Sequence, residues 1–351
     1  MIRPATLQAN AAEPVIQLGH GGGGKLSQRL IQELLVPAFG PKDGLLHDAA
    51  LLPPIEGQLA FTTDSYVVHP LIFPGGDIGR LAVIGSVNDL AMAGATPVAL
   101  SLGLILEEGL AMAVLETVVA SIQTAAAECG VAVVTGDTKV VERGKGDGLF
   151  INTSAVGRVA PGLTIHPRAV REGDAVLVSG DLGRHGIAIL AARGQLGFQA
   201  PLISDLAPLL GPVQALLAAG LQPHCLRDLT RGGLASAIDE IARSAGHWIE
   251  LEDGAIPVAP SVQGACDLLG FDPIALANEG RMVVILPAGE APAALAILRA
   301  FEPSAAPIGT VLQPFGAGHK DQPRNPVSLR SALGVKRPLE VGLGELLPRI
   351  C

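Results

Sequence analysis

The fold of this chain is most constrained by a regular alternation between short apolar runs and longer segments rich in alanine and leucine. Residues 59–68 and 149–159 are apolar runs of strand length, and residues 78–93 and 110–129 have the longer, glycine-broken pattern of helices. With 351 residues and 49% hydrophobic content, the chain can bury a core in each of two domains. The alternation therefore predicts a globular α/β protein.

A stretch rich in proline, glycine and charge, residues 161–174, is the expected boundary between two such units. The second unit opens with an expected strand at 175–179, a glycine turn and a helix at 186–193. Both units close on an apolar strand with a Gly-x-Val turn, which is a weak internal echo. These patterns predict a glycine-rich loop with a helix, a first α/β domain, a second α/β domain, and a linker with a tail, at 1–40, 41–160, 161–312 and 313–351.

The last part of the chain is expected to be mobile. Residues 313–325 are mainly glycine, proline and polar residues, which favours a linker, and residues 326–351 contain three prolines and no long helical period. Pro348 restrains the preceding residue towards an extended conformation, so the tail is interpreted as delivering the Cys351 thiol into a slot. The alternative is that Cys351 is an incidental terminal residue.

Low charge content raises the question of a membrane, because only 16% of residues are charged and the mean hydropathy is +0.44. The longest uncharged run, residues 90–106, contains glycine, proline and serine and falls short of the ~20 apolar residues of a spanning helix. The first residues show no signal-peptide pattern. A net charge of −9 also argues against a nucleic-acid partner. We expect a cytoplasmic protein with neither a membrane nor a nucleic-acid partner.

Four cysteines lie far apart, without any C-x-x-C pair, which indicates neither a disulfide framework nor a zinc finger. Cys129, Cys225 and Cys266 sit in apolar segments, where a small buried thiol is the usual interpretation. Cys351 does not fit that pattern. Its α-carboxylate should raise the pKa of its thiol, and Arg349 offers partial compensation.

A glycine-rich segment, Gly-His-Gly-Gly-Gly-Gly-Lys, occupies residues 19–25 ahead of an expected helix. Consecutive glycines let backbone N–H groups approach phosphate oxygens, and a lysine supplies a positive charge. It is not a Walker A loop, because Leu26 follows the lysine. A flexible linker explains the segment equally well. If it is a phosphate loop, the binding residues are Gly21, Gly22, Gly23, Gly24 and Lys25.

Several aspartates recur in loops at the ends of expected strands and helices: Asp48, Asp64, Asp89, Asp137 and Asp228. In a chain so poor in charge, an acid between apolar segments is costly unless it is paired or bound to a metal. Carboxylates without a histidine cluster favour Mg²⁺ that bridges phosphates. For any single aspartate, helix capping or a turn is the alternative.

Lys139 and Glu279 stand out because each lies among small residues in an apolar neighbourhood. A surface ion pair is the commoner fate of such residues. In a cleft they would suit orientation and proton transfer. The residues alone leave both interpretations open.

The combination of motifs resembles the HypE family of hydrogenase expression/formation proteins, in the superfamily of aminoimidazole ribonucleotide synthetase, selenophosphate synthetase and thiamine-phosphate kinase. The superfamily is indicated by the glycine loop, Asn-Asp-Leu-Ala-Met-Ala-Gly at 88–94 and Asp-Leu-Thr-Arg-Gly-Gly at 228–233. The family itself is indicated by the motifs Phe-Thr-Thr-Asp-Ser, Phe-Pro-Gly-Gly-Asp-Ile-Gly, Thr-Gly-Asp-Thr-Lys-Val-Val and Pro-Arg-Ile-Cys, at 61–65, 73–79, 135–141 and 348–351.

This resemblance implies that a carbamoyltransferase, HypF, loads a carbamoyl group onto Cys351 and that the chain then dehydrates it with ATP and Mg²⁺. The product is a thiocyanate, and its cyanide passes to a HypC–HypD complex for the iron of a [NiFe] hydrogenase. Lys139 would stabilise developing charge and Glu279 would act as the base. By the same resemblance, nucleotide binding falls to the glycine loop, Asp64, Asn88 and Asp137, and metal binding to Asp48, Asp89 and Asp228.

The resemblance also implies a fold: a two-domain α/β (α+β) arrangement like that of aminoimidazole ribonucleotide synthetase, with a flexible C-terminal tail, forming a homodimer through the sheets of its N-terminal domains. The sequence departs from the family pattern where His47, not an acid, precedes Asp48, where Leu229 replaces a common proline, and at Gly22. Two rivals remain. One is a kinase or synthetase that acts on a free small molecule, and the other is a non-catalytic carrier of Cys351.

Overall fold

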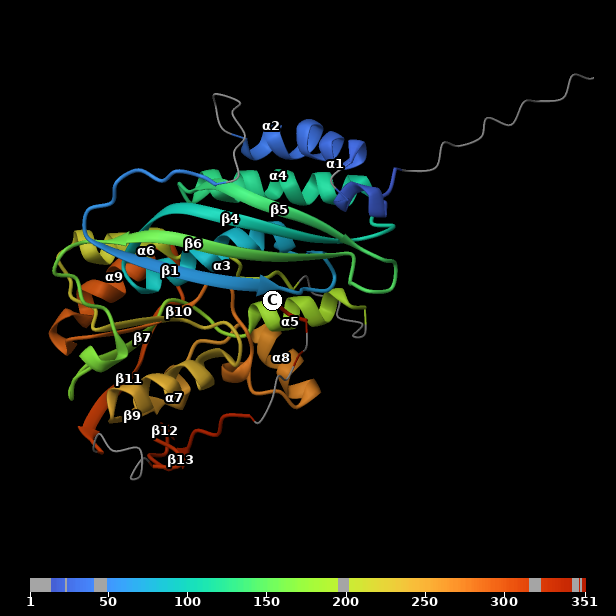
Figure 1. Ribbon diagram of the computed structural model, residues 1–351. Helices are drawn as coiled ribbons and strands as arrows, with labels where there is room; N and C mark the ends of the chain where they lie inside the picture. Colours follow the sequence, from blue (N-terminus) through green and yellow to red (C-terminus); the bar gives the residue numbers. More distant parts are fainter. Residues whose placement is uncertain are drawn as a thin grey trace, which may run out of the picture.

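The computed structural model of the protein describes residues 14–22, 24–40, 49–194, 202–315, 323–342, 347 and 349–351. Two β-sheets organise these residues, one in each half of the chain, with helices packed on their faces (Figure 1). A two-stranded ribbon, β2 (Ile72–Phe73) with β3 (Gly76–Asp77), precedes the first long helix. The predicted two-domain α/β architecture is confirmed.

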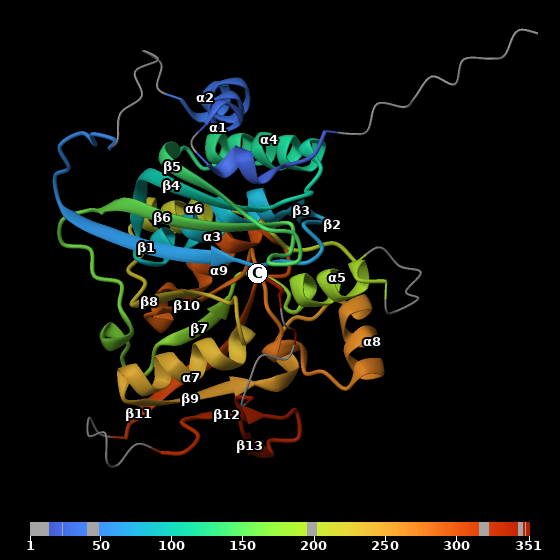
Figure 2. The ribbon, with the colours of Figure 1, turned by 45° about the vertical axis from the view of Figure 1, so that its right-hand side comes forward.

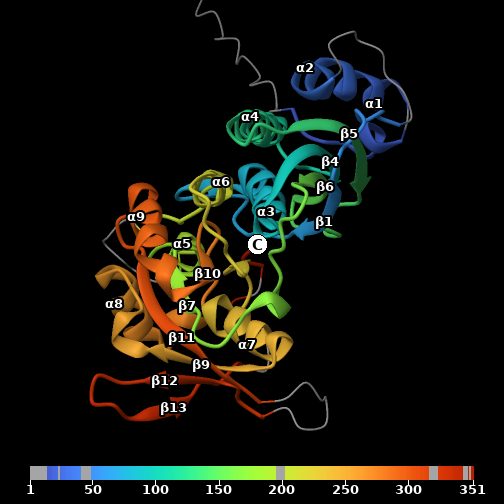
Figure 3. The ribbon, with the colours of Figure 1, turned by 90° about the vertical axis from the view of Figure 1, so that its left-hand side faces the viewer.

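The first sheet has four strands in the order β1–β6–β4–β5. β6 pairs antiparallel with β1 and with β4, whereas β4 and β5 are parallel. The strands are β1 (Gln58–Tyr66), β6 (Leu149–Val159), β4 (Ala95–Glu107) and β5 (Ala132–Val141). Two helices, α3 (Ile78–Met92) and α4 (Met112–Glu128), lie on one side of this sheet (Figure 3). The strand order places β1 and β5 at opposite edges of the sheet.

The other face of the first sheet carries exposed apolar side chains. Along β1 the exposure alternates, as expected for a strand covered on one side. Leu59 is 58% exposed and Phe61 is 70% exposed, and Ile105 of β4 is 39% exposed. We call this the open face of the first sheet.

Helix α3 is buried along almost its whole length because it is packed between the first sheet and the second half of the molecule. Its N-cap residue is Asp77, whose carboxylate accepts hydrogen bonds from the backbone nitrogens of Gly79 (2.7 Å) and Arg80 (3.1 Å). This cap fixes where α3 starts. The uncharged run 90–106 comprises the end of α3 and most of β4, so it is not a single spanning segment.

The second sheet has seven strands in the order β13–β12–β9–β11–β7–β10–β8. They are β7 (Ala175–Val178), β8 (Cys225–Asp228), β9 (His247–Glu252), β10 (Met282–Leu286), β11 (Ala306–Pro314), β12 (Val327–Arg330) and β13 (Lys336–Pro338). The helices of this half are α5 (Arg184–Ala192), α6 (Leu210–Ala218), α7 (Gly233–Ala245), α8 (Pro260–Leu269) and α9 (Ala291–Phe301).

Strand β7 shows how the second sheet is covered on both faces. Val176 and Val178 belong to the core that includes α7, while Leu177, between them, belongs to the core that includes α6 and α9. Strands buried on both faces are apolar without interruption, as β7 and β10 are.

The N-terminal helical segment packs beside the first sheet. It consists of α1 (Lys25–Leu30), a π-helical turn (Ile31–Leu35) and α2 (Val36–Phe39), and it contacts α4 and β5 (Figure 1). The glycine-rich residues precede it as a 3₁₀ turn (Leu18–Gly21) that lies against β5.

One expectation differs from the structure. Residues 326–351 are expected to form a mobile tail with no long helical period, but β12 and β13 within this range extend the second sheet. In β12, Val327 and Leu329 are buried while Arg330 is exposed, and β12 pairs parallel with β9. This alternation is only four residues long, which is too short to distinguish a strand from a linker. The segment 343–346 and Pro348 lie outside the described residues.

Among the helices of the described ranges, none is long and apolar enough to cross a membrane.

Candidate active site

A small cavity of about 40 Å³ lies between the two halves of the molecule. It is formed where β1 ends, along α3, at the loop after β8 and at the loop before β10. The C terminus reaches it between the end of β1 and α5 (Figure 2). Its lining residues are Asp64, Ser65, Tyr66, Gly85, Asp89, Asp228, Thr230, Arg231, Glu279 and Cys351.

Three of the predicted aspartates meet in this cavity, each from a different element. Asp64 comes from β1, Asp89 from α3 and Asp228 from the end of β8. Burial raises the pKa of Asp89 to about 6, although the Thr62 hydroxyl donates a hydrogen bond to it at 2.6 Å. Burial, and then the charge of Asp89, raises the pKa of Asp228 to about 7. Mutual repulsion among these carboxylates makes the site attractive to a cation.

Glu279 is the most deeply buried acid of the cavity, at 3% exposed. Its Oε1 atom has no hydrogen-bond partner. Burial, followed by the charge of Asp228, raises the pKa of this carboxyl well above its usual range, while a hydrogen bond with the Cys351 thiol acts in the opposite direction. Once it is ionised, a buried carboxylate with a raised pKa and an unused oxygen is a stronger proton acceptor for a group carried on the neighbouring sulfur.

The terminal cysteine is therefore brought to the predicted base. Leu347 and Ile350 are buried, at 8% and 3% exposed, and Cys351 is partly exposed at the cavity. The other cysteines are buried, and burial raises the pKa of the Cys225 thiol to about 12. Low thiolate content makes such cysteines poor nucleophiles.

Five further lining residues were not predicted as site residues: Ser65, Tyr66, Gly85, Thr230 and Arg231. The Tyr66 hydroxyl donates a hydrogen bond to Asp64 Oδ2 at 3.1 Å, and Gly85 of α3 leaves room for it. A Cβ atom on Gly85 would lie 2.3 Å from that hydroxyl oxygen. Arg231 is a cation at the cavity, in the Thr-Arg-Gly-Gly turn. The signals for Tyr66 and Arg231 were the single tyrosine of the chain, next to the Thr-Thr-Asp-Ser motif, and an arginine next to two glycines.

A second group of predicted residues lies at the opposite edge of the first sheet. Lys139 and Asp137 are exposed residues of β5, and Lys139 is in register with Ile105 on the open face. The glycine turn contacts the same strand, since a Cβ on Gly21 would lie 2.5 Å from the nitrogen of Val140. Three strand spacings, roughly 14 Å, separate β5 from β1. One chain therefore does not bring Lys139 to Glu279.

The remaining predicted residues have other positions. Asn88 does not line the cavity: its amide nitrogen donates to the carbonyl oxygens of Ala207 (3.2 Å) and Glu279 (3.4 Å), and its amide oxygen accepts from the nitrogen of Leu209 (2.7 Å). These bonds join α3 to the second half of the chain. Gly22 follows the glycine turn, and Gly24 and Lys25 lie at the start of α1. Asp48 and Gly23 lie outside the described residues.

The described residues contain no ready-made group of three metal-binding side chains. A structural zinc centre holds its metal with four protein ligands. Mg²⁺ differs, because it keeps several waters and takes phosphate oxygens with only one or two carboxylates. The cavity's aspartates fit the second type of ion.

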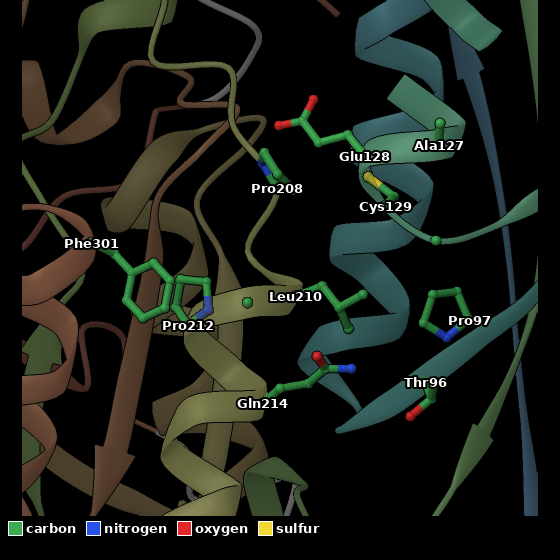
Figure 4. Close-up of a pocket in the computed structure, with 12 residues that line it drawn as sticks. Thr96, Pro97, Ala127, Glu128, Cys129, Pro208, Leu210, Pro212, Gln214 and Phe301 are labelled. Atoms are coloured by element: carbon green, nitrogen blue, oxygen red, sulfur yellow. The ribbon is translucent and has the colours of Figure 1, made fainter. Parts of the chain in front are cut away.

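A larger cavity of about 490 Å³ lies between the end of α4 and the start of α6 (Figure 4). Its lining is mainly proline, glycine and apolar side chains, with Phe301 and Cys129. Glu128 in this lining forms an ion pair with Arg80 at 2.6 Å, and burial raises the pKa of the Cys129 thiol to about 11. The lining thus lacks a cluster of reactive groups, and the smaller cavity is the candidate active site.

Two family descriptions match the chain. "AIR synthase related protein, N-terminal domain" matches residues 46–159, and "AIR synthase related protein, C-terminal domain" matches residues 171–320. These matches cover the first sheet with its two helices and most of the second half.

Curated relatives match along nearly the full length. The chain is 48% identical over 340 residues to the carbamoyl dehydratase HypE of Rhodobacter capsulatus. This alignment covers 96% of the chain and 98% of the relative. It is 44% identical to the carbamoyl dehydratase HypE of Escherichia coli strain K12, with 96% and 99% covered.

Solved structures agree with these relatives. The hydrogenase maturation protein HypE in complex with ATP superimposes with a TM-score of 0.88 at 47% identity, covering 95% of this chain and 99% of that chain. A chain of a HypE–HypF complex gives a TM-score of 0.76 at 40% identity, with 89% and 99% covered.

Proposed function

This chain belongs to the carbamoyl dehydratase HypE family, and on that premise we propose that it dehydrates, with ATP, a carbamoyl group carried on its own Cys351. The reaction converts the thiocarboxamide to a thiocyanate and supplies cyanide ligands for [NiFe]-hydrogenase maturation. The observation that carries the proposal is the meeting of the Cys351 thiol, Glu279 and three aspartates in one cavity.

The chemistry assigns a role to each of these groups. An amide oxygen is a poor leaving group. It would first attack the γ-phosphorus of ATP, so that an O–P bond forms as ADP leaves, and the C–O bond would then break with inorganic phosphate as the leaving group. Glu279 then accepts an amide proton through a carboxyl oxygen that has no other partner. Burial would keep water away from the reacting carbon. We assign Cys351 as the carrier and Glu279 as the base.

ATP and Mg²⁺ are the proposed cofactors. A HypE structure with ATP supports the nucleotide, and the repelling carboxylates of Asp64, Asp89 and Asp228 support a divalent cation beside its phosphates. Such a cation would neutralise phosphate charge. We propose Asp89 and Asp228 as its ligands, with Asp48 as a third, and Arg231 as a further phosphate contact.

The proposed partners are the carbamoyltransferase HypF and a HypC–HypD complex that accepts the cyanide. A solved HypE–HypF complex supports the first. We also propose a homodimer in which two open faces pack together, because Leu59, Phe61 and Ile105 form exposed apolar surface there. Lys139 and Asp137 lie on the same face, so a second chain would provide them with a buried environment.

The intact mass of the C-terminal peptide tests the reaction. Incubation with the carbamoyltransferase, carbamoyl phosphate and ATP should leave the peptide one water lighter than its thiocarboxamide form. Protein that already carries the carbamoyl group should keep the thiocarboxamide when ATP is withheld. If Cys351→Ala protein is modified equally well elsewhere, Cys351 is not the carrier.

A further inference from the structure

The last residues of the chain are held largely through their backbone. The Val67 nitrogen donates to the Cys351 carbonyl at 3.3 Å, and the His69 nitrogen donates to the Arg349 carbonyl at 3.2 Å. Residues 349–351 thereby run antiparallel to the segment that follows β1. Every one of these contacts could form with a different tail sequence, since none uses a tail side chain.

His185, near the start of α5, holds a third tail carbonyl. Its Nε2 atom lies 2.8 Å from the Ile350 oxygen, and its Nδ1 atom lies 2.8 Å from the Ser204 hydroxyl. Because a carbonyl only accepts, Nε2 carries the proton and Nδ1 accepts from the serine. His185 is fully buried, and burial lowers the pKa of its imidazole, which favours this neutral form.

Arg193, directly after α5, holds the tail from the other end of the helix. Its Nη2 atom donates to the Arg349 carbonyl at 2.7 Å, and its Nε atom donates to the His69 carbonyl at 2.9 Å. One guanidinium thus joins the tail to the segment against which it runs. The Arg349 side chain adds an ion pair with Asp147 at 2.5 Å.

The docked tail needs such support because Arg349 adopts a left-handed backbone conformation, with φ of 55°. That region is unfavourable for residues with a Cβ atom. Two contacts at its own carbonyl, from His69 and Arg193, stabilise the backbone where it is least favourable.

We propose that His185 and Arg193 form a clamp that recognises the tail backbone and positions the Cys351 thiol at Glu279. Both are positioning residues, since neither lines the cavity. This inference rests on the proposed function only in that the positioned thiol is the carrier. The clamp itself is a property of the protein without ATP, carbamoyl donor or partner.

Alkylation of Cys351 by iodoacetamide, followed by mass spectrometry of the C-terminal peptide, measures docking directly. Loss of one hydrogen-bonding group should favour the undocked tail, so Arg193→Ala should alkylate roughly three- to ten-fold faster than wild type. Arg184→Ala is the matched control, because Arg184 is the first residue of α5 and its guanidinium pairs with Asp181. Equal alkylation rates for the two variants, at equal melting temperatures, would overturn the clamp.

His185 gives a second, independent comparison. Glutamine can place its amide nitrogen near the position of Nε2, whereas the shorter asparagine reaches only the position of Nδ1. His185→Gln should therefore keep alkylation near the wild-type rate, and His185→Asn should accelerate it. A slow rate in both variants would remove His185 from the clamp.

Single-turnover dehydration of protein already carrying the carbamoyl group connects the clamp to the reaction. Arg193→Ala should dehydrate several-fold more slowly than Arg184→Ala, while loading by the carbamoyltransferase stays undiminished. Faster alkylation with unchanged dehydration would show that the clamp does not position the reacting thiol. If wild-type protein fails to dehydrate at all, the proposed function is wrong, but the alkylation comparison still decides whether the clamp exists.

Discussion

At the scale of single residues, the cavity holds several acidic side chains close together. Asp64, Asp89 and Asp228 occupy one small space, and the pKa values of Asp89 and Asp228 are raised mainly by burial. A binding site arranged for a cation is destabilising until the cation arrives. The metal-free protein should therefore gain stability when one of these charges is removed.

Asp228→Asn tests this expectation. Between its ordinary pKa near 3.8 and its folded value of about 7, Asp228 loses its proton in the unfolded chain but keeps it in the folded one. Burial of Asp228 therefore costs no ionisation free energy below pH 4, where the side chain is protonated in both states. Between pH 4 and pH 7 the free energy of unfolding falls as the pH rises, and above pH 7 the full cost is present. At pH 8, in a chelator, the variant should be more stable than wild type by on the order of a few kcal/mol.

Urea unfolding at pH 4.5 and pH 8 checks the sign as well as the size. The difference between Asp228→Asn and wild type should grow with pH and level off above 7. A variant that is less stable than wild type at pH 8 would show that Asp228 is stabilised by a partner and not strained by burial.

At this scale the structure gathers several residues that the sequence singled out, while their roles stay predictions. Asp64, Asp89, Asp228, Glu279 and Cys351 were all predicted, and they line one cavity. Lys139 was placed with them by resemblance, yet β5 carries it to the far edge of the sheet. Strand order depends on pairings between distant segments, which no local pattern specifies.

At the scale of elements, α3 depends on a glycine within the helix, although glycine has a low helix propensity. Replacing a glycine within a helix by alanine ordinarily stabilises it by about 1 kcal/mol. At Gly85, however, the new Cβ would lie 2.3 Å from the Tyr66 hydroxyl, inside a close-packed core. Gly85→Ala should therefore destabilise the protein, by about 1 to 3 kcal/mol.

Gly264 is the matched control, because it lies within α8 and a Cβ there meets nothing within 4 Å. Gly264→Ala should stabilise the protein by about 0.5 to 1 kcal/mol. The midpoints of urea unfolding compare the two directly. Equal shifts of the same sign would mean that Tyr66 can move aside without cost.

Some of the longer elements were predicted with close bounds, whereas the thirteen-residue strand β4 was not assigned from the sequence. The expected strand at 149–159 and the expected helix at 78–93 match β6 and α3 closely. The short strands β12 and β13 were missed, since three or four residues carry too little periodicity. Their place in the sheet comes from pairing with β9, which lies far away in the sequence.

At the scale of the whole molecule, the predicted residues lie at two opposite edges of the first sheet. In the proposed homodimer, one active site would therefore contain residues from both chains. If open faces pack together as proposed, the β5 edge of one chain can complete the cavity of the other. Lys139→Ala and Glu279→Gln proteins should each accumulate the thiocarboxamide when assayed alone. A mixed dimer would contain one site with both native groups, and dehydration should return.

Mixing the two variants after subunit exchange, with mass analysis of the C-terminal peptide, measures this recovery. A mixture of Glu279→Gln with Cys351→Ala is the negative control, since both residues lie in the same cavity of one chain. It should stay inactive. Failure of the first mixture to recover would place Lys139 outside the reaction or within its own chain's site.

The contact between the two halves of the molecule has a consequence for evolution and for protein engineering. Asn88 reaches across it, but every partner of its amide is a main-chain atom: the carbonyls of Ala207 and Glu279 and the nitrogen of Leu209. Main-chain partners survive any substitution that leaves the loop's path intact. Chimeras that join the first half of this protein to the second half of a relative should therefore keep this joint, so the halves are free to diverge, or to be exchanged, without co-ordinated change at Asn88.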